Sequence, residues 1–376
     1  MYGTNFYVFF IIIRIDKKDG GWYNYIQRKV AWNMRNQNPK ITYMNIATNR
    51  TPEMRFNGEG DFWEWQSNAR AKLRDLLGLD LIEKCDFDFL QEEVTEFEDY
   101  TQIRFSFQSE PGYYVPAYIQ IPKNYEGKLK PMICLQGHSK GMHISLGIPK
   151  FPGDEESING GDRDFANSAR ANGYCPVIVE QRFMGECGGT DKGPSCHTGW
   201  DVDYKMSVLS SLALGIPAIG LRVWDVSRTI DVIGENFPML DMDNVYCMGN
   251  SGGGTVTFYA ACIDERIKAC MPSCAVCTFR HSIIGLKHCP CNYIQGVARY
   301  FDMGDLAGLI APRKLVTVSG QLDHGFPIEG AEECMAIAKR LYTYAGCPEN
   351  VIHVVGELGH RFYAEKGYKA FNELVK

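Results

Sequence analysis

Short apolar runs recur along the chain from Pro131 onward, and each is followed by glycine-rich or polar residues and then by a stretch with helical spacing. The runs read "PMICLQG", "YCPVIVEQ", "NVYCMGN", "RIKACMPSCAV", "KLVTVSG" and "NVIHVVGE". Strands that are apolar on both faces and alternate with helices are typical of a mostly parallel sheet covered by helices on both sides. The pattern predicts an α/β fold, in which ligands bind at the carboxyl ends of the strands.

The N-terminal part of the chain shows a different pattern. The stretch "DFWEWQSNARAKLRDLLGLD" has leucines at helical spacing, and Gly78 stands where a helix would end. After it, "TQIRFSFQSEPGYYVPAYIQIPKN" alternates around a glycine-containing turn, as an antiparallel hairpin does. We therefore expect residues 1–95 to form an N-terminal extension whose helix packs on a core domain at residues 96–376.

The apolar run "YVFFIIIRI" near the N-terminus is about nine residues long, whereas a helix that spans a bilayer needs about 20. The preceding "MYGTN" has no positive charge, and "RIDKKDGG" follows without the small residues of a cleavage site. The sequence therefore predicts no membrane partner and a cytoplasmic protein, with secretion as the alternative.

Composition excludes two classes of protein. Hydrophobic residues make up 45% of the 376 residues and charged residues 22%, which is typical of a globular protein and not of a disordered one. The formal net charge is −6, whereas a nucleic-acid binder needs concentrated Lys and Arg to neutralise phosphates. We expect no nucleic-acid partner, and the sequence leaves open whether the chain forms a homo-oligomer.

The segment from Gly249 to Gly253 matches the pattern G-x-S-x-G, with Ser251 at its centre. A strand-like "NVYCM" precedes it and a helix-like "TVTFYAACID" follows. This context is typical of a nucleophile elbow, in which glycines keep side chains from colliding where the strand and the helix meet. A phosphate-binding loop would need G-K-[ST], and no lysine is present here.

A serine hydroxyl is a poor nucleophile unless a base takes its proton and a carboxylate orients that base. Asp323 follows the strand-like "KLVTVSG", and His360 follows the last strand-like run. Both residues come after Ser251 in the chain, in the order Ser, Asp, His that this kind of fold uses. Asp302 and Asp305 are rival acids, but they precede their strand. The sequence therefore predicts a triad of Ser251, Asp323 and His360.

A tetrahedral intermediate also needs fixed N–H donors for its oxyanion. The N–H of Gly252, directly after the serine, is the first expected donor. The second is expected from the loop "LQGHSKG", at His138 or Ser139. The sequence leaves two roles open for the side chain of His138, which either contacts the substrate or caps a turn.

The sequence contains 14 cysteines, mostly inside apolar runs, which predicts buried reduced thiols and a reducing compartment. One window admits a zinc site, because it holds Cys274, Cys277, His288, Cys289 and Cys291. Cys274 lies in a predicted buried strand, however, and C-x-C lacks the two-residue gap of a zinc knuckle. We therefore expect no metal and no cofactor.

These motifs together resemble the acetyl xylan esterase-like α/β-hydrolases, a branch close to dienelactone hydrolases and prolyl oligopeptidases. The resemblance runs from about Trp63 to the C-terminus, and the combination of "LIAPR" with "DHGFPI" is its most specific part. It implies Ser251 as nucleophile, Asp323 as orienting acid, His360 as base, and a backbone oxyanion hole. It also implies a serine carboxylesterase that removes small acyl groups, acetyl above all, from a carbohydrate or another small-molecule alcohol.

The chain departs from that family's pattern at "EQRFMGECGG" and at "HCPCNY", which lies in a predicted lid-like insertion at about 278–303. Trp200, Trp224 and Tyr363 are candidates for stacking on a sugar, although core packing is the commoner role of such aromatics. The expected substrate-binding residues are Gln136, Gly137, Arg182, Phe183 and Phe326.

Two other functions fit parts of this pattern. An aminopeptidase of the prolyl oligopeptidase kind shares the triad, but the region before the core is too short for a β-propeller and has no evident paired-glutamate motif. A non-catalytic binding protein on the same scaffold is the other alternative, and an intact Ser, Asp and His set argues against it.

Overall fold

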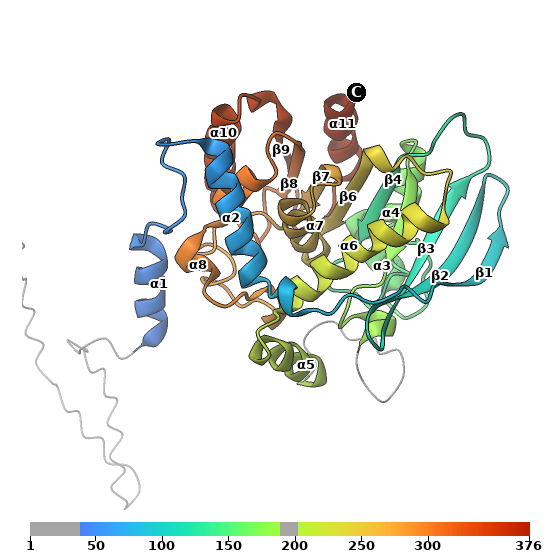
Figure 1. The fold of residues 1–376 in the computed structure, drawn as a ribbon, viewed down its shortest axis with the longest axis horizontal. Helices are drawn as coiled ribbons and strands as arrows, with labels where there is room; N and C mark the ends of the chain where they lie inside the picture. The colour runs from blue at the N-terminus through green and yellow to red at the C-terminus, as the bar shows by residue number, and fades with distance from the viewer. Residues whose placement is uncertain (1–37, 189–201) are drawn as a thin grey trace, which may run out of the picture.

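The computed structural model describes residues 38–188 and 202–376, drawn in colour in Figure 1. The apolar run near the N-terminus and Trp200 lie outside the described residues. In the described part, a nine-stranded sheet runs in the order β1-β2-β3-β5-β4-β6-β7-β8-β9. Its strands are β1 (Leu90–Glu96), β2 (Tyr100–Glu110), β3 (Tyr113–Pro122), β4 (Pro131–Leu135), β5 (Cys175–Val179), β6 (Val245–Asn250), β7 (Ile267–Ser273), β8 (Lys314–Gly320) and β9 (Val351–Gly356).

Helices lie on both faces of this sheet (Figure 1). They are α1 (Pro39–Asn49), α2 (Phe62–Leu76), α3 (Asp154–Gly161), α4 (Phe165–Ala171), α5 (Val202–Ala213), α6 (Ala218–Asn236), α7 (Gly252–Ile263), α8 (Val297–Tyr300), α9 (Met303–Leu306), α10 (Ile328–Tyr344) and α11 (Ala364–Val375). A short 3-10 helix, η4 (Pro290–Asn292), lies between β7 and β8.

All six apolar runs of the sequence form strands, and these are parallel to one another from β5 through β4 and β6 to β9. Alternate residues of a strand belong to two different hydrophobic cores. In β6, for example, Tyr246 and Met248 pack with α4 and α11, whereas Val245 and Cys247 pack with α2, α6 and α7. Each of these strands is therefore apolar on both faces, and the prediction of a mostly parallel sheet is confirmed.

The predicted helix around residue 70 is α2. The Asp61 side chain accepts hydrogen bonds from the N–H groups of Trp63 and Glu64, which satisfies two free donors of the first turn. The helix ends before Gly78, whose φ of 64° is left-handed and suits a glycine. Buried Leu73 then packs the helix against the larger core.

The predicted hairpin is formed by β2 and β3, which pair antiparallel along nearly their whole length. A further strand, β1, pairs with β2 and starts at Leu90. The sheet therefore begins inside the stretch that the sequence suggested as an extension. A strand is normally marked in the sequence by residues that alternate between a core and solvent. Six of the seven residues of β1 are exposed, so β1 lacks this signal.

No disulfide joins the described cysteines, and all of them except Cys85 and Cys187 are buried. Among the described residues, no single helix is long and apolar enough to cross a membrane. The bent pair of α5 and α6 reaches that length and composition together, with an angle of 87° between its two parts.

Candidate active site

Ser251 lies between the end of β6 and the start of α7, in a backbone conformation that non-glycine residues rarely adopt. Its φ is 58° and its ψ is −122°. The surrounding backbone holds this strained turn in place, because the Ser251 N–H donates to the carbonyl of Ser273 at 2.9 Å and the Thr255 N–H donates to the carbonyl of Ser251 at 2.8 Å. The serine side chain is partly exposed at the end of the sheet.

The glycines around the serine are there because the backbones pass too close for a side chain. A Cβ at Gly253 would lie 2.0 Å from the carbonyl oxygen of Leu135 in β4, and a Cβ at Gly249 would lie 2.6 Å from the backbone of Gly253. These distances are far below van der Waals contact. The tight crossing of strand and helix that the sequence predicted is therefore present at this turn.

Asp323 follows β8 and His360 follows β9, and the two side chains meet. Nδ1 of His360 lies 2.7 Å from Oδ2 of Asp323. The other carboxylate oxygen of Asp323 accepts hydrogen bonds from the N–H groups of Gly325, at 2.8 Å, and Phe326, at 3.1 Å. Because the carboxylate accepts from Nδ1, the proton of a neutral His360 lies on Nδ1, and Nε2 is left as the base.

The electrostatic surroundings keep Asp323 ionised. Burial acts to raise the pKa of this carboxyl group, which is 4% exposed, but the hydrogen bond and charge interaction with His360 outweigh it and lower the pKa below its ordinary value. The ring of Phe326 is stacked near-parallel to His360 with centroids 6.0 Å apart. The imidazole is thus held from two sides and remains partly exposed.

The loop after β4 carries the candidate oxyanion residues and lies against the serine. A Cβ at Gly137 would meet the carbonyl oxygen of Asn250 at 2.8 Å and Cβ of Ser251 at 2.9 Å. A Cβ at Gly252 would meet the imidazole of His138 at 3.0 Å. The loop backbone and the His138 ring therefore both lie next to the N-terminus of α7, where free N–H groups and the helix dipole favour negative charge.

A buried carboxyl group, Glu180, anchors this loop at both ends. Nε2 of Gln136 donates to one of its oxygens, and the N–H of Met142 donates to the other at 3.1 Å. Glu180 is 1% exposed, and burial raises its pKa to about 7, with the nearby charge of Glu186 acting in the same direction. The loop after β4 therefore depends on a carboxyl group whose pKa lies near neutral pH.

A cavity of about 640 Å³ opens over these groups. It is lined by most of the residues that the sequence singled out, namely Gln136, Gly137, His138, Ser139, Ser251, Gly252, Asp323, Phe326 and His360. Lys287, His288, Cys289 and Asn292 also line it, so the predicted lid-like insertion forms one wall. The structure thus brings together segments that are more than 200 residues apart in the sequence.

Two predicted substrate residues lie elsewhere. Arg182 does not line the cavity and is 5% exposed. Its Nε and Nη2 donate to the two oxygens of Asp225, at 3.0 and 2.7 Å, and Nη1 pairs with Glu110. Phe183, its neighbour, packs against Tyr204 rather than the cavity. Arg182 follows β5 as the sequence indicated, but the carboxylates of the buried Asp225 and the partly exposed Glu110 take up its charge.

The candidate sugar-stacking aromatics among the described residues also lie outside the cavity lining. Nε1 of Trp224 donates to the carbonyl of Ser109 at 2.9 Å, and the hydroxyl of Tyr363 donates to the carbonyl of Gly359 at 2.8 Å. Both side chains have core partners. Sequence reasoning missed Arg163 and His324, which do line the cavity. Arg163 follows no strand and belongs to no motif, so no signal marked it. His324 stands next to Asp323 inside "DHGFPI", so that motif could have marked it.

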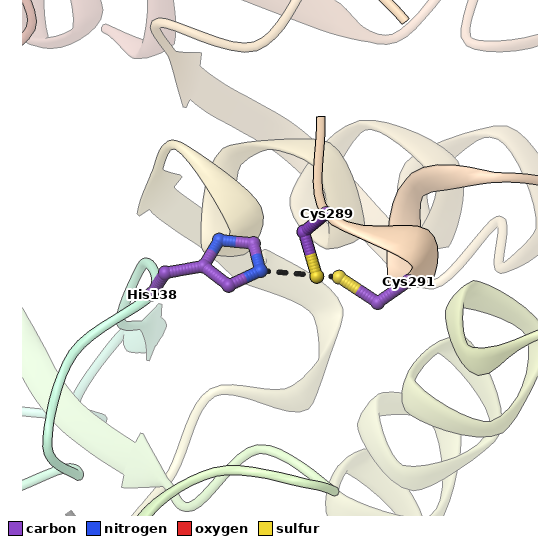
Figure 2. Close-up of side chains that lie close together, drawn as sticks. All are labelled: His138, Cys289 and Cys291. Atoms are coloured by element: carbon purple, nitrogen blue, oxygen red, sulfur yellow. Dashed lines mark hydrogen bonds between the residues drawn. The ribbon is translucent and has the colours of Figure 1, made fainter. Parts of the chain in front are cut away.

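The five residues of the possible zinc window do not come together. Cys274 contacts the carbonyl of Arg361, and Cys277 contacts that of Pro327. His288 lies 3.0 Å from the carbonyl of Gly325. Cys289 and Cys291 instead face His138 of the loop after β4, whose imidazole points toward both sulfurs in Figure 2.

The matched family places the chain among the hydrolases. The model of the Abhydrolase family matches residues 41–366, which is most of the chain. The chain belongs to the Abhydrolase family. The predicted resemblance to α/β-hydrolases, the fold class and the assignment to the hydrolytic enzymes of this fold are thereby confirmed.

Individual relatives are distant. The protein named "Putative hydrolase YtaP" of Bacillus subtilis (strain 168) is 24% identical over 253 residues, which cover 65% of this chain and 77% of that protein. The crystal structure of a "putative acetyl xylan esterase" from Bacteroides fragilis has a TM-score of 0.70 at 17% identity and covers 87% of this chain and 84% of that one. A glucuronoyl esterase from Solibacter usitatus has a TM-score of 0.61 at 15% identity, covering 84% and 93%. At these identities the solved structures show a shared fold.

Proposed function

We propose that this protein is a serine carboxylesterase that hydrolyses small acyl esters of carbohydrates, with acetyl as the preferred acyl group. The observation that carries this proposal is the shared cavity: Ser251 on its strained turn and the hydrogen-bonded pair of His360 and Asp323 line the same space. The names of the structural neighbours, an acetyl xylan esterase and a glucuronoyl esterase, support a carbohydrate ester as substrate.

In the proposed reaction, Oγ of Ser251 attacks the carbonyl carbon of the ester while Nε2 of His360 accepts the hydroxyl proton. Asp323 keeps the imidazole in the tautomer with its proton on Nδ1 and stabilises the imidazolium that forms. His360 then gives the proton to the departing alcohol, which leaves an acyl-serine. A water molecule, deprotonated by the same imidazole, releases the carboxylic acid and restores the serine.

The oxyanion of each tetrahedral intermediate forms next to the N-terminus of α7. The N–H of Gly252 is the first proposed donor, and the N–H of His138 or Ser139 is the second. In well-studied hydrolases, removal of one such donor costs about 2.7–4 kcal/mol in the barrier. The close contact of Gly137 with Ser251 brings the loop within reach of the reacting carbonyl.

A fluorophosphonate probe tests whether Ser251 is the nucleophile. The wild-type protein should be labelled at Ser251, and Ser251→Ala should lose both labelling and ester hydrolysis while its far-UV circular dichroism stays unchanged. Ser139→Ala, which removes the other serine hydroxyl that lines the cavity, should still be labelled. Hydrolysis by Ser251→Ala within about a hundredfold of wild type would point to another nucleophile, since intact triads contribute far more.

A panel of p-nitrophenyl esters, acetylated sugars and an aminoacyl anilide tests the substrate class. Because the stretch at 287–292 and Phe326 wall the cavity, long acyl chains should collide with it. We expect kcat/KM for acetyl or propionyl esters to exceed that for octanoyl by at least about tenfold, or ~1.4 kcal/mol. Octanoyl as the best substrate would reject acetyl preference, and turnover of the anilide alone would favour the aminopeptidase alternative.

A second substrate class is favoured by Arg163. This residue lines the cavity, its Nη1 donates to Ser157 at 2.7 Å, and it has no carboxylate partner among the described ion pairs. A cation in such a place suits a substrate that carries a carboxylate, such as an acetylated sugar acid whose carboxyl group is free. If so, Arg163→Gln should raise KM for acetylated sugars that carry a carboxylate, while KM for the neutral sugar esters should stay near that of wild type.

A further inference from the structure

Three side chains with metal-binding atoms meet beside the candidate oxyanion loop, and the proposed esterase reaction uses none of these atoms. They are His138 of the loop and Cys289 and Cys291 of the insertion between β7 and β8 (Figure 2). Their ligand atoms all lie within 4.8 Å of one another, and Nε2 of His138 lies 3.1 Å from Sγ of Cys291. Both cysteines are buried, at 4% and 0% exposure.

The donor set and the spacing suit zinc. Two cysteine sulfurs and one imidazole nitrogen form a known three-ligand set that leaves a fourth position for solvent. With Zn–S near 2.3 Å and Zn–N near 2.05 Å, tetrahedral geometry requires about 3.8 Å between sulfurs and about 3.6 Å between sulfur and nitrogen. The His138 to Cys291 distance would have to grow by only about half an ångström to reach this spacing.

A buried positive charge beside the sulfurs is a second, independent observation. Arg222 is 1% exposed, takes part in none of the described ion pairs with a carboxylate, and has an Nη1 atom without a hydrogen-bond partner. Its Nη2 lies 3.4 Å from the hydroxyl of Tyr204, which in turn lies 3.1 Å from Sγ of Cys289. A buried guanidinium needs a nearby anion, and thiolates, the form of cysteine that binds metals, would supply it.

The earlier expectation of no metal rested on the residues of one sequence window. His138 lies outside that window, about 150 residues before the two cysteines, and only the fold brings it to them. The C-x-C spacing, which is unlike that of a zinc knuckle, is no obstacle here, because η4 begins between the two cysteines and turns both sulfurs toward the same side.

We propose that His138, Cys289 and Cys291 bind one zinc ion, with solvent from the cavity as the fourth ligand. The ion would join the oxyanion loop to the insertion that walls the cavity, because one ligand comes from the first and two from the second. His138 and Cys289 both line the cavity, so the fourth position is accessible to solvent. The site is separate from the triad and stands whether or not the protein is an esterase.

Metal content tests the proposal directly. The full chain is purified under reducing conditions, dialysed against zinc chloride, freed of loosely bound metal and measured by elemental analysis. Wild type should retain about one zinc per chain, whereas Cys289→Ser, Cys291→Ser and His138→Ala should each retain less than a fifth of that. Cys277→Ser is the matched control, since it removes a thiol of the same sequence window whose sulfur contacts Pro327 instead, and it should keep the zinc.

A cobalt-substituted protein identifies the ligands. Co²⁺ in the wild type should give thiolate-to-cobalt absorption in the near ultraviolet and visible bands of tetrahedral cobalt, and Cys289→Ser and Cys291→Ser should lose the thiolate absorption. Thermal unfolding should show that zinc raises the Tm of wild type and of Cys277→Ser only. The variants' circular dichroism without metal separates loss of the site from loss of the fold.

Three results would overturn the proposal. The wild type could retain no zinc after this treatment, or mass spectrometry could show a Cys289–Cys291 disulfide in the reduced preparation. The zinc could also lie at the triad, where Cys274, Asp323 and His360 bring their ligand atoms within 4.8 Å of one another. In that last case Cys274→Ser would lose the metal and Cys289→Ser would keep it.

Discussion

The sequence offers three aspartates as the orienting acid, namely Asp302, Asp305 and Asp323. Their carboxylates have different partners in the structure. Asp323 holds His360, whereas Asp302 accepts from the N–H groups of Phe279 and Met303 and Asp305 pairs with Arg55. Asp302 and Asp305 thus fix the start of α9, where they form a capping box. The two rival acids of the sequence therefore have a structural role.

We therefore expect Asp323→Asn to lower kcat by about 10⁴, the loss typical of this substitution in a serine protease, because the amide favours the wrong tautomer of the imidazole. Asp302→Asn should leave kcat within about tenfold of wild type and change the Tm little, because asparagine caps a helix about as well as aspartate does. Steady-state kinetics on p-nitrophenyl acetate and a thermal melt measure both. The opposite ranking of the two variants in kcat would assign the acid to Asp302.

A second prediction at this scale concerns Gly137, which lies against Ser251. An alanine Cβ there would meet the carbonyl oxygen of Asn250 at 2.8 Å, so the loop or the serine turn must shift. A displacement of about 1 Å in such a site typically costs about a hundredfold in rate. We expect Gly137→Ala to lose at least about tenfold in kcat/KM.

The matched control is Gly160→Ala, since Gly160 lies in α3 with nothing within 4 Å of its would-be Cβ. This variant should keep full activity and gain a little stability, because alanine favours helix more than glycine does. Equal kinetics for both variants would mean that the loop does not position the reaction.

At the scale of secondary-structure elements, a buried charge network joins β2, α6 and the loop after β5. Arg182 binds Asp225 of α6 through two hydrogen bonds, Ser109 of β2 donates to the same carboxylate at 2.6 Å, and the guanidinium lies 3.8 Å from the ring centre of Tyr113. Asp225 is 3% exposed. The network fixes the antiparallel end of the sheet to the helix that covers it.

Removal of Asp225 leaves the buried guanidinium of Arg182 with the partly exposed Glu110 as its remaining carboxylate partner, and the break of a buried ion pair typically costs about 3–5 kcal/mol. Asp225→Ala should therefore lower the free energy of unfolding by about that amount, as measured by urea denaturation. Glu53→Ala breaks the exposed ion pair with Arg299 and should cause a much smaller change, because water screens such pairs. Similar losses in both variants would show that burial does not set the strength of the pair.

The sequence predicted the position of a residue best where that residue directly follows a strand. Ser251, Asp323 and His360 each stand just after a fully apolar run, so the parallel sheet brings them to one edge without further information. Arg182 also follows such a run, but its side chain does not line the cavity, because Asp225, 43 residues later, takes up its charge. The pairing of His138 with Cys291, 153 residues apart, had no local signal at all.

At the scale of the whole molecule, the stability should depend on the protonation of Glu180. Its pKa is about 7 in the folded protein and near 4.5 when exposed, so the folded state binds more protons between these values. The contribution of this carboxyl group to stability is then largest below about pH 4.5, falls as the pH rises toward 7 and levels off above it. The difference amounts to about 3 kcal/mol as an order of magnitude.

Glu180→Gln removes the titrating group and should flatten the fall in stability between about pH 5 and 7 relative to wild type. Urea denaturation at several pH values measures the difference between the two proteins, in which the other titrating groups largely cancel. Glu357→Gln, at an exposed site paired with Lys366, serves as the control and should keep the wild-type slope. A slope that Glu180→Gln leaves intact would mean that this carboxyl group stays ionised when buried.

The buried cysteines report local opening of the structure, because a thiol becomes reactive only when the structure around it opens. Burial raises the pKa of Cys175 in β5 and of Cys262 in α7 to about 12, so neither thiol reacts with an alkylating reagent while the structure around it is closed. Cys334 in α10 is buried in the same way. Mass spectrometry of the wild-type chain during brief alkylation in mild denaturant would therefore report which strand or helix separates from the core first, without any introduced label.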